Sequence, residues 1–356
     1  MMELKLQFDF ATQQVILRKV AAIDAFQSRW QIEQLDEKLF LKQLKSEVMV
    51  ESTGSSTRIE GSTLTNLEVE SVLKTMKITE LKTRDEQEVV GYYEVLSLIM
   101  SDFDAIPLTE NYISQLHGHL LRHSDKDQRH RGAYKNLSNQ VVATSPGGTR
   151  NVVFNTTVPH LTPMAMRDLM EWTTTSFQND TLHPLLTIPV FVYEFLSIHP
   201  FQDGNGRLSR LLTTRLLLQK GYDFIQYCSF ENLIEERKKD YYRSLVDGQQ
   251  KRGQPDEIIA KWLVFFLDCL LVLTTQLTQK RTKYKALKGY LNDRQKQILE
   301  TIKEQKSVQV ADLVRIMPTS SRGTLKNDLT LLVERKLITV VGKGRGVRYF
   351  LTDFAV

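Results

Sequence analysis

The segment that most constrains the fold is His199–Arg210, which reads HPFQDGNGRLSR. The apolar run at 189–198 predicts a helix, and this helix should end near His199 because a residue before proline avoids helical backbone angles. Gly204 and Gly206 then predict a tight turn. A second amphipathic helix should open at Arg207 and continue to about Leu218. Two helices joined by a short polar loop are therefore the expected centre of the fold.

The same loop gathers side chains that can bind phosphates and react with them. Glycines directly before a helix start let backbone N–H groups surround an anion, and the helix dipole adds to the attraction. Arg207 and Arg210 lie three residues apart and share one helix face. Asp203 offers the oxygen ligand that a hard cation requires, and His199 has a pKa suited to a general base. Each feature alone is commonly structural, but together they favour chemistry on a nucleotide phosphate.

This segment resembles the Fic family signature, HPFx[DE]GNGRxxR, at all nine specified positions, and a weaker resemblance covers roughly residues 50–245. The resemblance implies an all-helical bundle with a β-hairpin flap over the active site. It also implies transfer of AMP from ATP to a Tyr, Ser or Thr hydroxyl of a target protein, with self-modification as one option. Other family members use UTP, GTP or choline-bearing nucleotides, or transfer phosphate alone. ATP is the commonest donor and the one expected here.

The resemblance assigns a role to each position of the signature. His199 would deprotonate the target hydroxyl, Asp203 would hold Mg²⁺ on the α- and β-phosphates, and Phe201 would pack into the core. The other positions would bind phosphates: Gly204, Asn205 and Gly206 around the α-phosphate, Arg207 beside it, and Arg210 at the γ-phosphate. Tyr241 and Tyr242 occur where many members contact adenosine, although YYRSLV is also typical of a core helix.

A second match precedes the signature. Ser56–Gly61, STRIEG, resembles the inhibitory helix motif [ST]xxxE[GN] of the class II members, in which inhibition lies in the chain's own N-terminal region. The resemblance implies that Glu60 pairs with Arg210 and occupies the group that would bind the γ-phosphate, with Ser56 supporting Glu60. In some relatives the same Glu positions a water that removes AMP from a modified target. Transfer, removal or both are therefore open.

In the rest of the first 280 residues, the sequence pattern predicts helices and one hairpin. Val15, Ile16, Val20, Ile23 and Phe26 approximate one helical face. The run at 51–57 is polar, and the pairs Ser56 with Glu60 and Ser62 with Asn66 are typical of helix starts. Further helices are expected at Glu86–Ser101, from a Thr109 cap to about Leu121, at Met164–Phe177, at Thr187–Ile198 and at Trp262–Leu277. Two β-prone runs at 141–143 and 151–158, separated by SPGGT, predict the hairpin flap.

Composition narrows the class of protein. Among 356 residues, 41% are hydrophobic and 25% charged, which excludes disorder of the whole chain. The two cysteines, Cys228 and Cys269, exclude a disulfide scaffold and a cysteine-rich zinc site, and they fit a reducing compartment. No apolar run reaches the ~18–20 residues that span a bilayer; the longest, Trp262–Leu273, contains Asp268. No signal-peptide pattern is visible. We therefore expect a cytoplasmic protein without a membrane partner.

The C-terminal region differs from the rest in charge. Residues 281–356 hold 16 Lys or Arg and 7 Asp or Glu, a net charge of +9, while the other 280 residues have a net charge of −4. Positive charge favours contact with polyanions, although a solvated helical surface explains it equally well.

The pattern of this region predicts three helices and a hairpin. The helices are expected at Arg294–Glu304, Val310–Ile316 and Arg322–Leu337, with Thr319, Ser320 or Ser321 as cap of the last. Two short strands follow around GKGRG, and the whole resembles a winged helix-turn-helix. If it binds DNA, four residues of the last helix would face the major groove: Arg322, Thr324, Lys326 and Asn327. Two residues of the wing, Lys343 and Arg345, would touch phosphate or the minor groove. Protein contact or homodimer formation is the alternative use.

The sequence thus predicts a mainly α protein: a Fic-type helical bundle with a β-hairpin flap and a C-terminal winged helix. The expected domains are an inhibitory helical region at 1–85, a catalytic domain at 86–280 and a winged-helix domain at 290–356. The expected function is a Mg²⁺- and ATP-dependent protein adenylyltransferase that is autoinhibited by Glu60. A hydrolase that removes AMP and a nucleotide-sensing DNA-binding regulator are the alternatives. The intact His199 favours chemistry, since a sensor that only binds nucleotide needs no base.

Overall fold

A computed structural model of the chain describes residues 3–33, 38–75, 81–144, 150–288, 292–342 and 344–352. The chain divides into two compact units. The first comprises residues 1–33 and 45–275, and the second comprises residues 34–44 and 276–356. Each unit has its own hydrophobic core. The sequence-predicted boundaries at 85, 86, 280 and 290 stay a prediction.

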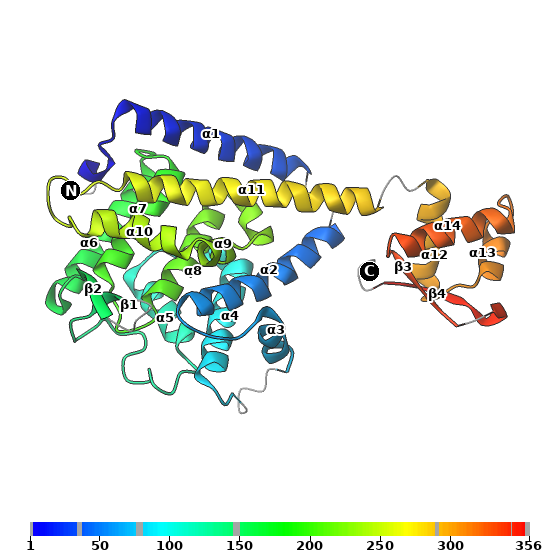
Figure 1. Cartoon of the computed structure of the whole chain (residues 1–356), viewed down its shortest axis with the longest axis horizontal. Coiled ribbons are helices and arrows are strands. Elements are labelled where there is room, and N and C mark those ends of the chain that lie inside the picture. The colour runs from blue at the N-terminus through cyan, green and yellow to red at the C-terminus, as the bar shows by residue number, and fades with distance from the viewer. Residues whose placement is uncertain are drawn as a thin grey trace. The chain divides into compact units, whose positions relative to one another are not determined.

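The first unit is mainly helical (Figure 1). Its α-helices are α1 (Phe10–Glu33), α2 (Lys38–Ile59, whose first residues belong to the second unit), α3 (Asn66–Thr75), α4 (Arg84–Asp102), α5 (Glu110–Leu120), α6 (Thr162–Gln178), α7 (Pro184–Ile198), α8 (Asn205–Gln219), α9 (Phe230–Glu236), α10 (Lys238–Gln249) and α11 (Ala260–Lys288, which ends in the second unit). Short 3-10 helices occur at η1 (Glu3–Leu6), η4 (Phe103–Ala105), η5 (Pro159–Leu161) and η6 (Asp223–Tyr227).

Helices α7 and α8 form the centre of this unit. α7 packs on α6 and α8, and α8 also packs on α4 and α5. From Leu185 to Ile198 almost every side chain of α7 is buried, which explains why its sequence is apolar on all sides. Helix α8 is buried as well, yet it contains three arginines. One of them is Arg215, whose Nε donates to the carbonyl oxygen of Ile106 at 2.9 Å. A buried polar helix start is thus placed in the middle of an apolar bundle.

The predicted hairpin is confirmed. β1 (Gln140–Thr144) pairs antiparallel with β2 (Arg150–Asn155), and the register runs from Gln140 opposite Asn155 to Thr144 opposite Arg150. An irregularity between Val141 and Val142 shifts the pairing by one residue. The predicted turn at 145–149 lies outside the described residues.

The polar run at 51–57 is helical, and it corrects the expectation of a helix start at Ser56 and Glu60. It forms the last turns of α2, where Ser52, Thr53, Ser55, Ser56 and Thr57 are all buried. Their hydroxyls bond within the helix or across to other elements, as Ser52 Oγ does to Ser229 Oγ at 2.9 Å. The Ser56–Glu60 pair is therefore at a helix end and not at a helix start.

The start of α3 also differs from the prediction. The reciprocal bonds are made by Thr65 and Glu68, not by Ser62 and Asn66: Thr65 N donates to Glu68 Oε2 at 2.8 Å, and Glu68 N donates to Thr65 Oγ1 at 3.3 Å. This exchange is a capping box, which satisfies backbone N–H groups that a helix start leaves free.

Helix α11 corrects the membrane argument. By length and composition its stretch Ala260–Tyr284 is apolar enough to cross a bilayer, so the prediction that no segment qualifies is wrong. Core helices of globular proteins pass the same test, and 56% of the apolar window is buried within the fold. Trp262, Phe266 and Leu270 are among its fully buried side chains. Cys228 and Cys269 are both free and buried.

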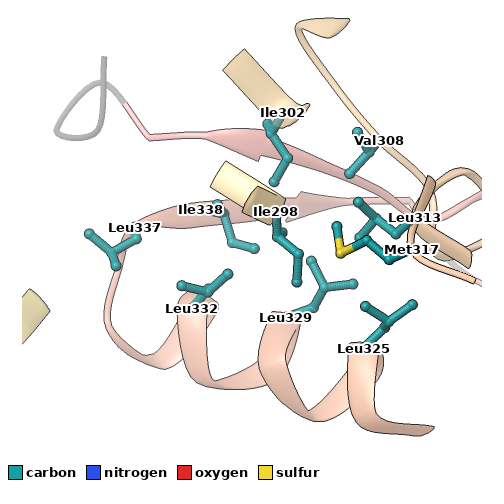
Figure 2. Packing of buried hydrophobic residues seen from close by; sticks show 10 residues of the cluster. All are labelled: Ile298, Ile302, Val308, Leu313, Met317, Leu325, Leu329, Leu332, Leu337 and Ile338. Carbon is teal, nitrogen blue, oxygen red and sulfur yellow. The ribbon is translucent and has the colours of Figure 1, made fainter. Parts of the chain in front are cut away.

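The second unit contains three helices and a strand pair, in the predicted order. The elements are α12 (Asp293–Gln305), α13 (Val310–Ile316), α14 (Arg322–Glu334), β3 (Ile338–Val341), η7 (Gly344–Gly346) and β4 (Arg348–Leu351). β3 and β4 pair antiparallel with Ile338 opposite Leu351. Figure 2 shows the core, in which leucines of one face of α14 meet Ile298, Ile302 and Leu313 from the other helices. α14 ends at Glu334, three residues before the predicted end, and its cap is Ser321.

Candidate active site

His199 ends α7 in a left-handed conformation, with φ 54° and ψ 61°. Its Nδ1 lies 3.2 Å from the carbonyl oxygen of Leu196. Because a carbonyl can only accept, Nδ1 carries the proton of this bond and Nε2 keeps its lone pair. Burial lowers the pKa of His199 to about 4, so the ring is neutral at pH 7. A non-glycine residue in this conformation is strained, which is common at functional sites.

The side chain of Asn205 closes the loop. Its Oδ1 accepts from Phe201 N at 2.9 Å, and its Nδ2 donates to Phe201 O at 2.7 Å. Phe201 itself is fully buried, as predicted. Both polar atoms of the Asn205 side chain are thus used within the loop. The anion-binding role that the sequence assigned to this residue therefore falls to its backbone N–H alone.

Helix α8 begins without a side-chain cap. Gly204 precedes it with φ 77°, and no side-chain hydrogen bond caps the first turn. Leu208 N bonds to Gly204 O at 2.9 Å, which leaves the N–H groups of residues 205–207 without an acceptor inside the helix. Such a start attracts anions. A Cβ at Gly206 would lie 2.2 Å from Glu60 Oε1, so glycine is required for the carboxylate to approach this helix start.

Arg207 is almost completely buried and only partly satisfied. Its Nη2 lies 3.4 Å from Asp203 Oδ1, and its Nη1 lies 3.1 Å from Glu88 Oε2 without hydrogen-bond geometry. Nε and Nη1 have no hydrogen-bond partner among the described residues. Buried N–H donors without acceptors are costly. An anionic ligand beside the start of α8 would satisfy them.

Arg210 is held by the end of α2. Its Nε donates to Ser56 Oγ at 2.8 Å, and its Nη2 donates to Ser56 O at 3.0 Å and to Glu60 Oε1 at 2.8 Å. Burial opposes the ionised form of Glu60, but Arg210 and then Arg207 lower its pKa below the ordinary value. A third of the Glu60 side chain is exposed, at 33%. The ion pair that the family resemblance implied is present, with Ser56 bound to Arg210 and not to Glu60.

The carboxylate of Asp203 is bound by a backbone N–H and lies near two arginines. Gly204 N donates to its Oδ1 at 2.6 Å, while its Oδ2 lies 3.4 Å from Arg84 Nη2. Burial opposes ionisation, but Arg207 and the Gly204 N–H lower the pKa of Asp203. The carboxylate is therefore ionised at neutral pH and available as an oxygen ligand.

The two tyrosines predicted to contact adenosine, Tyr241 and Tyr242, differ in exposure. Tyr241 is a core residue, packed edge-to-face on Trp262 at 5.8 Å between ring centroids, and burial raises its pKa to about 12. Tyr242 is 37% exposed, and burial followed by the charge of Glu60 raises its pKa. Only Tyr242 is accessible enough for a nucleotide contact.

The predicted DNA-contacting residues belong to the second unit. Arg322, Lys326 and Asn327 are exposed on α14, and Thr324 is half-buried. Lys343 lies outside the described residues, and the side chain of Arg345 is also not described.

Residues 107–217 match the family model of the Fic/DOC family. The chain contains a Fic/DOC family domain. Curated relatives with the name protein adenylyltransferase Fic agree with the match: that of Drosophila melanogaster is 29% identical over 243 residues, 67% of this chain and 46% of its own, and that of Drosophila grimshawi is 28% identical over 222 residues, 59% of this chain and 43% of its own. The chain thus spans less than half the length of these relatives.

Solved structures agree with the Fic fold. A Fic family protein from Desulfovibrio desulfuricans G20 superposes with a TM-score of 0.65 at 25% identity, over 95% of this chain and 96% of that chain. A Fic domain containing signaling protein from Bacteroides thetaiotaomicron VPI-5482 superposes with a TM-score of 0.59 at 22% identity, over 73% of this chain and 97% of that chain, which supports the fold alone.

The Fic domain depends on residues that sequence reasoning missed. His117 accepts from Gly132 N at 2.8 Å through Nδ1, so its Nε2–H donates to Asp203 O at 3.0 Å, and its ring stacks on Phe201. Glu88 of α4 accepts from Arg84 Nε at 2.7 Å and faces Arg207. Asp203 lies 86 positions from His117, and Arg207 lies 119 positions from Glu88, so no local pattern could have found these two contacts.

Proposed function

We propose that the chain is a protein adenylyltransferase that moves AMP from ATP to a Tyr, Ser or Thr hydroxyl of a target protein. One observation carries the proposal: a helix start that follows Gly204 and has no side-chain cap belongs to the same loop as two buried arginines and a neutral His199, whose Nε2 has no hydrogen-bond partner among the described residues. The names of the curated relatives support the same activity.

The geometry suits attack at the α-phosphorus. The target oxygen forms a bond to this phosphorus, the bond to the oxygen that bridges to the β-phosphate breaks, and pyrophosphate leaves. The hydroxyl proton passes to Nε2 of His199, which is neutral and can accept it. The N–H groups of residues 205–207 and the free donors of Arg207 stabilise the charge that develops on the phosphate oxygens.

Mg²⁺ fits the carboxylate of Asp203. This ion commonly binds one or two carboxylates together with substrate phosphates. Among the described residues no group of three or more His, Cys, Asp or Glu could hold a metal alone, so the phosphates would supply most of the remaining ligands. When bound there, Mg²⁺ would offset negative charge on the α- and β-phosphates.

Glu60 is the inhibitory group in this proposal. Its carboxylate bonds Arg210 and approaches the start of α8 so closely that a side chain at Gly206 would collide with it. It thereby takes the position and the cation that the phosphates of ATP need. Without Glu60, Arg210 remains oriented by Ser56 and is free for the γ-phosphate.

Transfer of radiolabel tests this proposal. Wild type and Glu60→Gly are incubated with α-³²P-ATP and Mg²⁺, alone and with a cell extract as source of targets. We expect weak protein labelling by the wild type and strong labelling by Glu60→Gly. Competition with unlabelled UTP and GTP identifies the donor. Absence of protein label from α-³²P-ATP with both variants would contradict the proposal.

Removal of AMP is the second candidate, and it uses the same site. The lowered pKa of Glu60 keeps a partly exposed carboxylate ionised among the catalytic groups, where it could orient a water. A target labelled by Glu60→Gly is the required substrate. If wild type releases AMP from it and Glu60→Gly does not, the chain is a hydrolase as well; release by neither variant excludes this activity.

For the second unit we propose a winged helix that binds duplex DNA. The exposed face at the start of α14 presents Arg322, Lys326 and Asn327, and the acidic Asp328 beside them is turned inward, where Gln295 Nε2 donates to it at 2.8 Å. Gly323 is exposed in the first turn of the same helix. Basic side chains exposed at a helix start, with the exposed acid Glu334 at the opposite end of α14, suit phosphate contact.

Salt dependence tests duplex binding by the full chain. We expect affinity for a labelled duplex to fall linearly with salt on logarithmic axes. The rival is a protein contact or homodimer through β3, where Val340 and Val341 are 48% and 58% exposed. A concentration-dependent dimer with no duplex binding at low salt would favour this rival.

A further inference from the structure

Lys135 is a buried lysine in the segment that leads into β1, and only 3% of it is exposed. Its Nζ donates to three acceptors: Asn139 Oδ1 at 2.8 Å, Thr156 Oγ1 at 2.8 Å and the carbonyl oxygen of Ile198 at 3.0 Å. An ammonium group has three N–H donors, so all of them are used.

These three acceptors lie at the ends of the elements that form the site. Asn139 directly precedes β1, Thr156 directly follows β2, and Ile198 directly precedes His199. One ammonium group therefore connects both ends of the hairpin to the residue before the proposed base.

Further bonds reinforce the same connection. Lys135 N donates to Pro200 O at 2.8 Å, and Asn139 Nδ2 donates to Phe201 O at 2.9 Å. Thr156 Oγ1 lies 2.9 Å from Asn139 O and 2.5 Å from Asn139 Oδ1. The base of the hairpin and the loop at 198–201 are thus one hydrogen-bonded body.

The chemistry of the contact is unusual for a buried lysine. Its partners are an amide, a hydroxyl and a carbonyl, and no ion pair to a carboxylate joins it among the described residues. Burial lowers the pKa of Lys135 to about 8. A buried charge without a counterion is costly, so such a residue is weak as a source of stability and stronger as a source of specific geometry.

We propose that Lys135 is a positioning residue of the transfer reaction, which sets the hairpin edge at a fixed place relative to His199. The proposal rests on the proposed adenylyl transfer, in which a target segment pairs with the hairpin edge as an added strand. The hydroxyl of that segment reaches Nε2 of His199 only if the hairpin and the loop keep their relative position. A displacement of about 1 Å can reduce a rate about 100-fold.

The test compares full-length variants in the Glu60→Gly background. Lys135→Met removes the three donors and keeps the approximate length of the side chain, and Lys135→Arg restores donors. Lys45→Met is the matched control, since Lys45 is also partly buried and donates to a carbonyl, that of Met100 at 3.3 Å, and to Gln226 Oε1 at 2.9 Å. Each variant is measured for binding of a non-hydrolysable ATP analogue, for protein labelling, and for hydrogen exchange of peptides that cover β1, β2 and the rest of the first unit.

We expect Lys135→Met to bind the analogue within about twofold of its parent, to label protein at least tenfold more slowly, and to exchange faster in the hairpin peptides only. These limits follow from a positional effect of the size given above. Lys135→Arg should regain part of the labelling rate, and Lys45→Met should match its parent.

Two results would overturn the proposal: unchanged labelling by Lys135→Met, or parallel losses of labelling, nucleotide binding and exchange protection throughout the first unit, which would make Lys135 a residue of general stability. If the parent Glu60→Gly labels nothing, the proposed function fails instead. Hydrogen exchange then still decides whether Lys135 joins the hairpin to the loop, because unchanged exchange in β1 and β2 would refute that joint.

Discussion

Two helix starts in this chain are built in opposite ways. Helix α8 begins after Gly204 without a side-chain cap, and its arginines are buried. Helix α14 begins after Ser321, whose Oγ accepts from Thr324 N at 3.1 Å, and its Arg322 and Lys326 are exposed. The first start leaves backbone donors free at a cost to stability, whereas the second satisfies one of them internally.

This difference indicates how selective each site can be. Around α8 every charged group is oriented by a second contact, as Arg210 is by Ser56 and Asp203 by Gly204 N. Preorganised donors in a buried site stabilise developing charge strongly. The cations of α14 are free to move in water, so they suit contact with a repetitive polyanion and contribute little per residue. This contrast agrees with the two proposals, which are catalysis at the start of α8 and binding of duplex DNA by α14.

Loss of His199 should give the largest effect. His199→Ala in the Glu60→Gly background removes the only proposed proton acceptor, and a general base commonly contributes about 10²–10⁴-fold to a rate. Labelling from α-³²P-ATP should therefore fall at least 100-fold. His119→Ala, on an exposed position of α5, is the control and should keep its parent's rate. A loss below tenfold would show that another group accepts the proton.

Release of Glu60 should give the next largest effect, and in the opposite direction. Glu60→Gly frees Arg210 and the start of α8, so initial labelling rates should rise tenfold or more over wild type, roughly the factor for 1.4 kcal/mol of lost competition. Glu60→Gln separates charge from shape and should activate less, because the amide still occupies the space above Gly206. Equal rates for wild type and both variants would refute the inhibitory role.

The exposed cations of α14 should matter for duplex binding and not for labelling. Arg322→Ala with Lys326→Ala should weaken duplex binding several-fold at low salt and reduce the logarithmic salt slope by about 0.9 for each lost phosphate contact. Lys303→Ala with Lys306→Ala removes the same charge from exposed positions at the end of α12. Equal losses in both double variants would mean that only net charge matters.

The cap of α14 should contribute to stability alone. Ser321→Ala removes the acceptor for Thr324 N and should lower the free energy of unfolding of the second unit by about 1 kcal/mol. Chemical denaturation followed by circular dichroism measures it. Thr319→Ala, an exposed position in the same loop, should change that free energy far less. Equal effects of the two substitutions would show that the cap is not Ser321.

The pH dependence should show the smallest change. A histidine with the ordinary pKa near 6.5 would lose half of its base form at that pH. Since the pKa of His199 is lowered to about 4, its base form persists on acidification until that lower value is approached. Initial labelling rates of Glu60→Gly should thus vary less than about twofold between pH 7.5 and 5.5. A midpoint near pH 6.5 would contradict this environment of His199.

The sequence predicted the elements well where periodicity and breakers agree. α13 has the expected bounds, and α7 ends at the proline-preceding His199 as expected. The helix start expected at Ser56 and Glu60 was wrong because serine is typical of helix starts, whereas here the serines and threonines of 51–57 are packed inside the last turns of α2. Gly54, for example, admits Arg58 and Asn66, since a Cβ there would lie 2.6 Å from Arg58 Nη1.

The candidate site was predictable as a motif and not as an environment. The nine signature positions predict the loop, and the resemblance of STRIEG to the inhibitory motif predicts the ion pair of Glu60 with Arg210. The contacts of His117, Glu88 and Lys135 join segments far apart in the chain, so they depend on tertiary packing that one sequence does not encode locally. The same holds for Tyr241, whose place in the core follows from its neighbour Trp262.

The central claim is that the site transfers the adenylyl group itself. The most direct test is to incubate Glu60→Gly with Mg²⁺ and ATP labelled either at the α- or at the γ-phosphate, and to measure protein-bound label and intact mass. The account predicts label from the α-position alone and a mass increase of one AMP unit per modified hydroxyl. Label from the γ-position, with a mass increase of one phosphate, would contradict it.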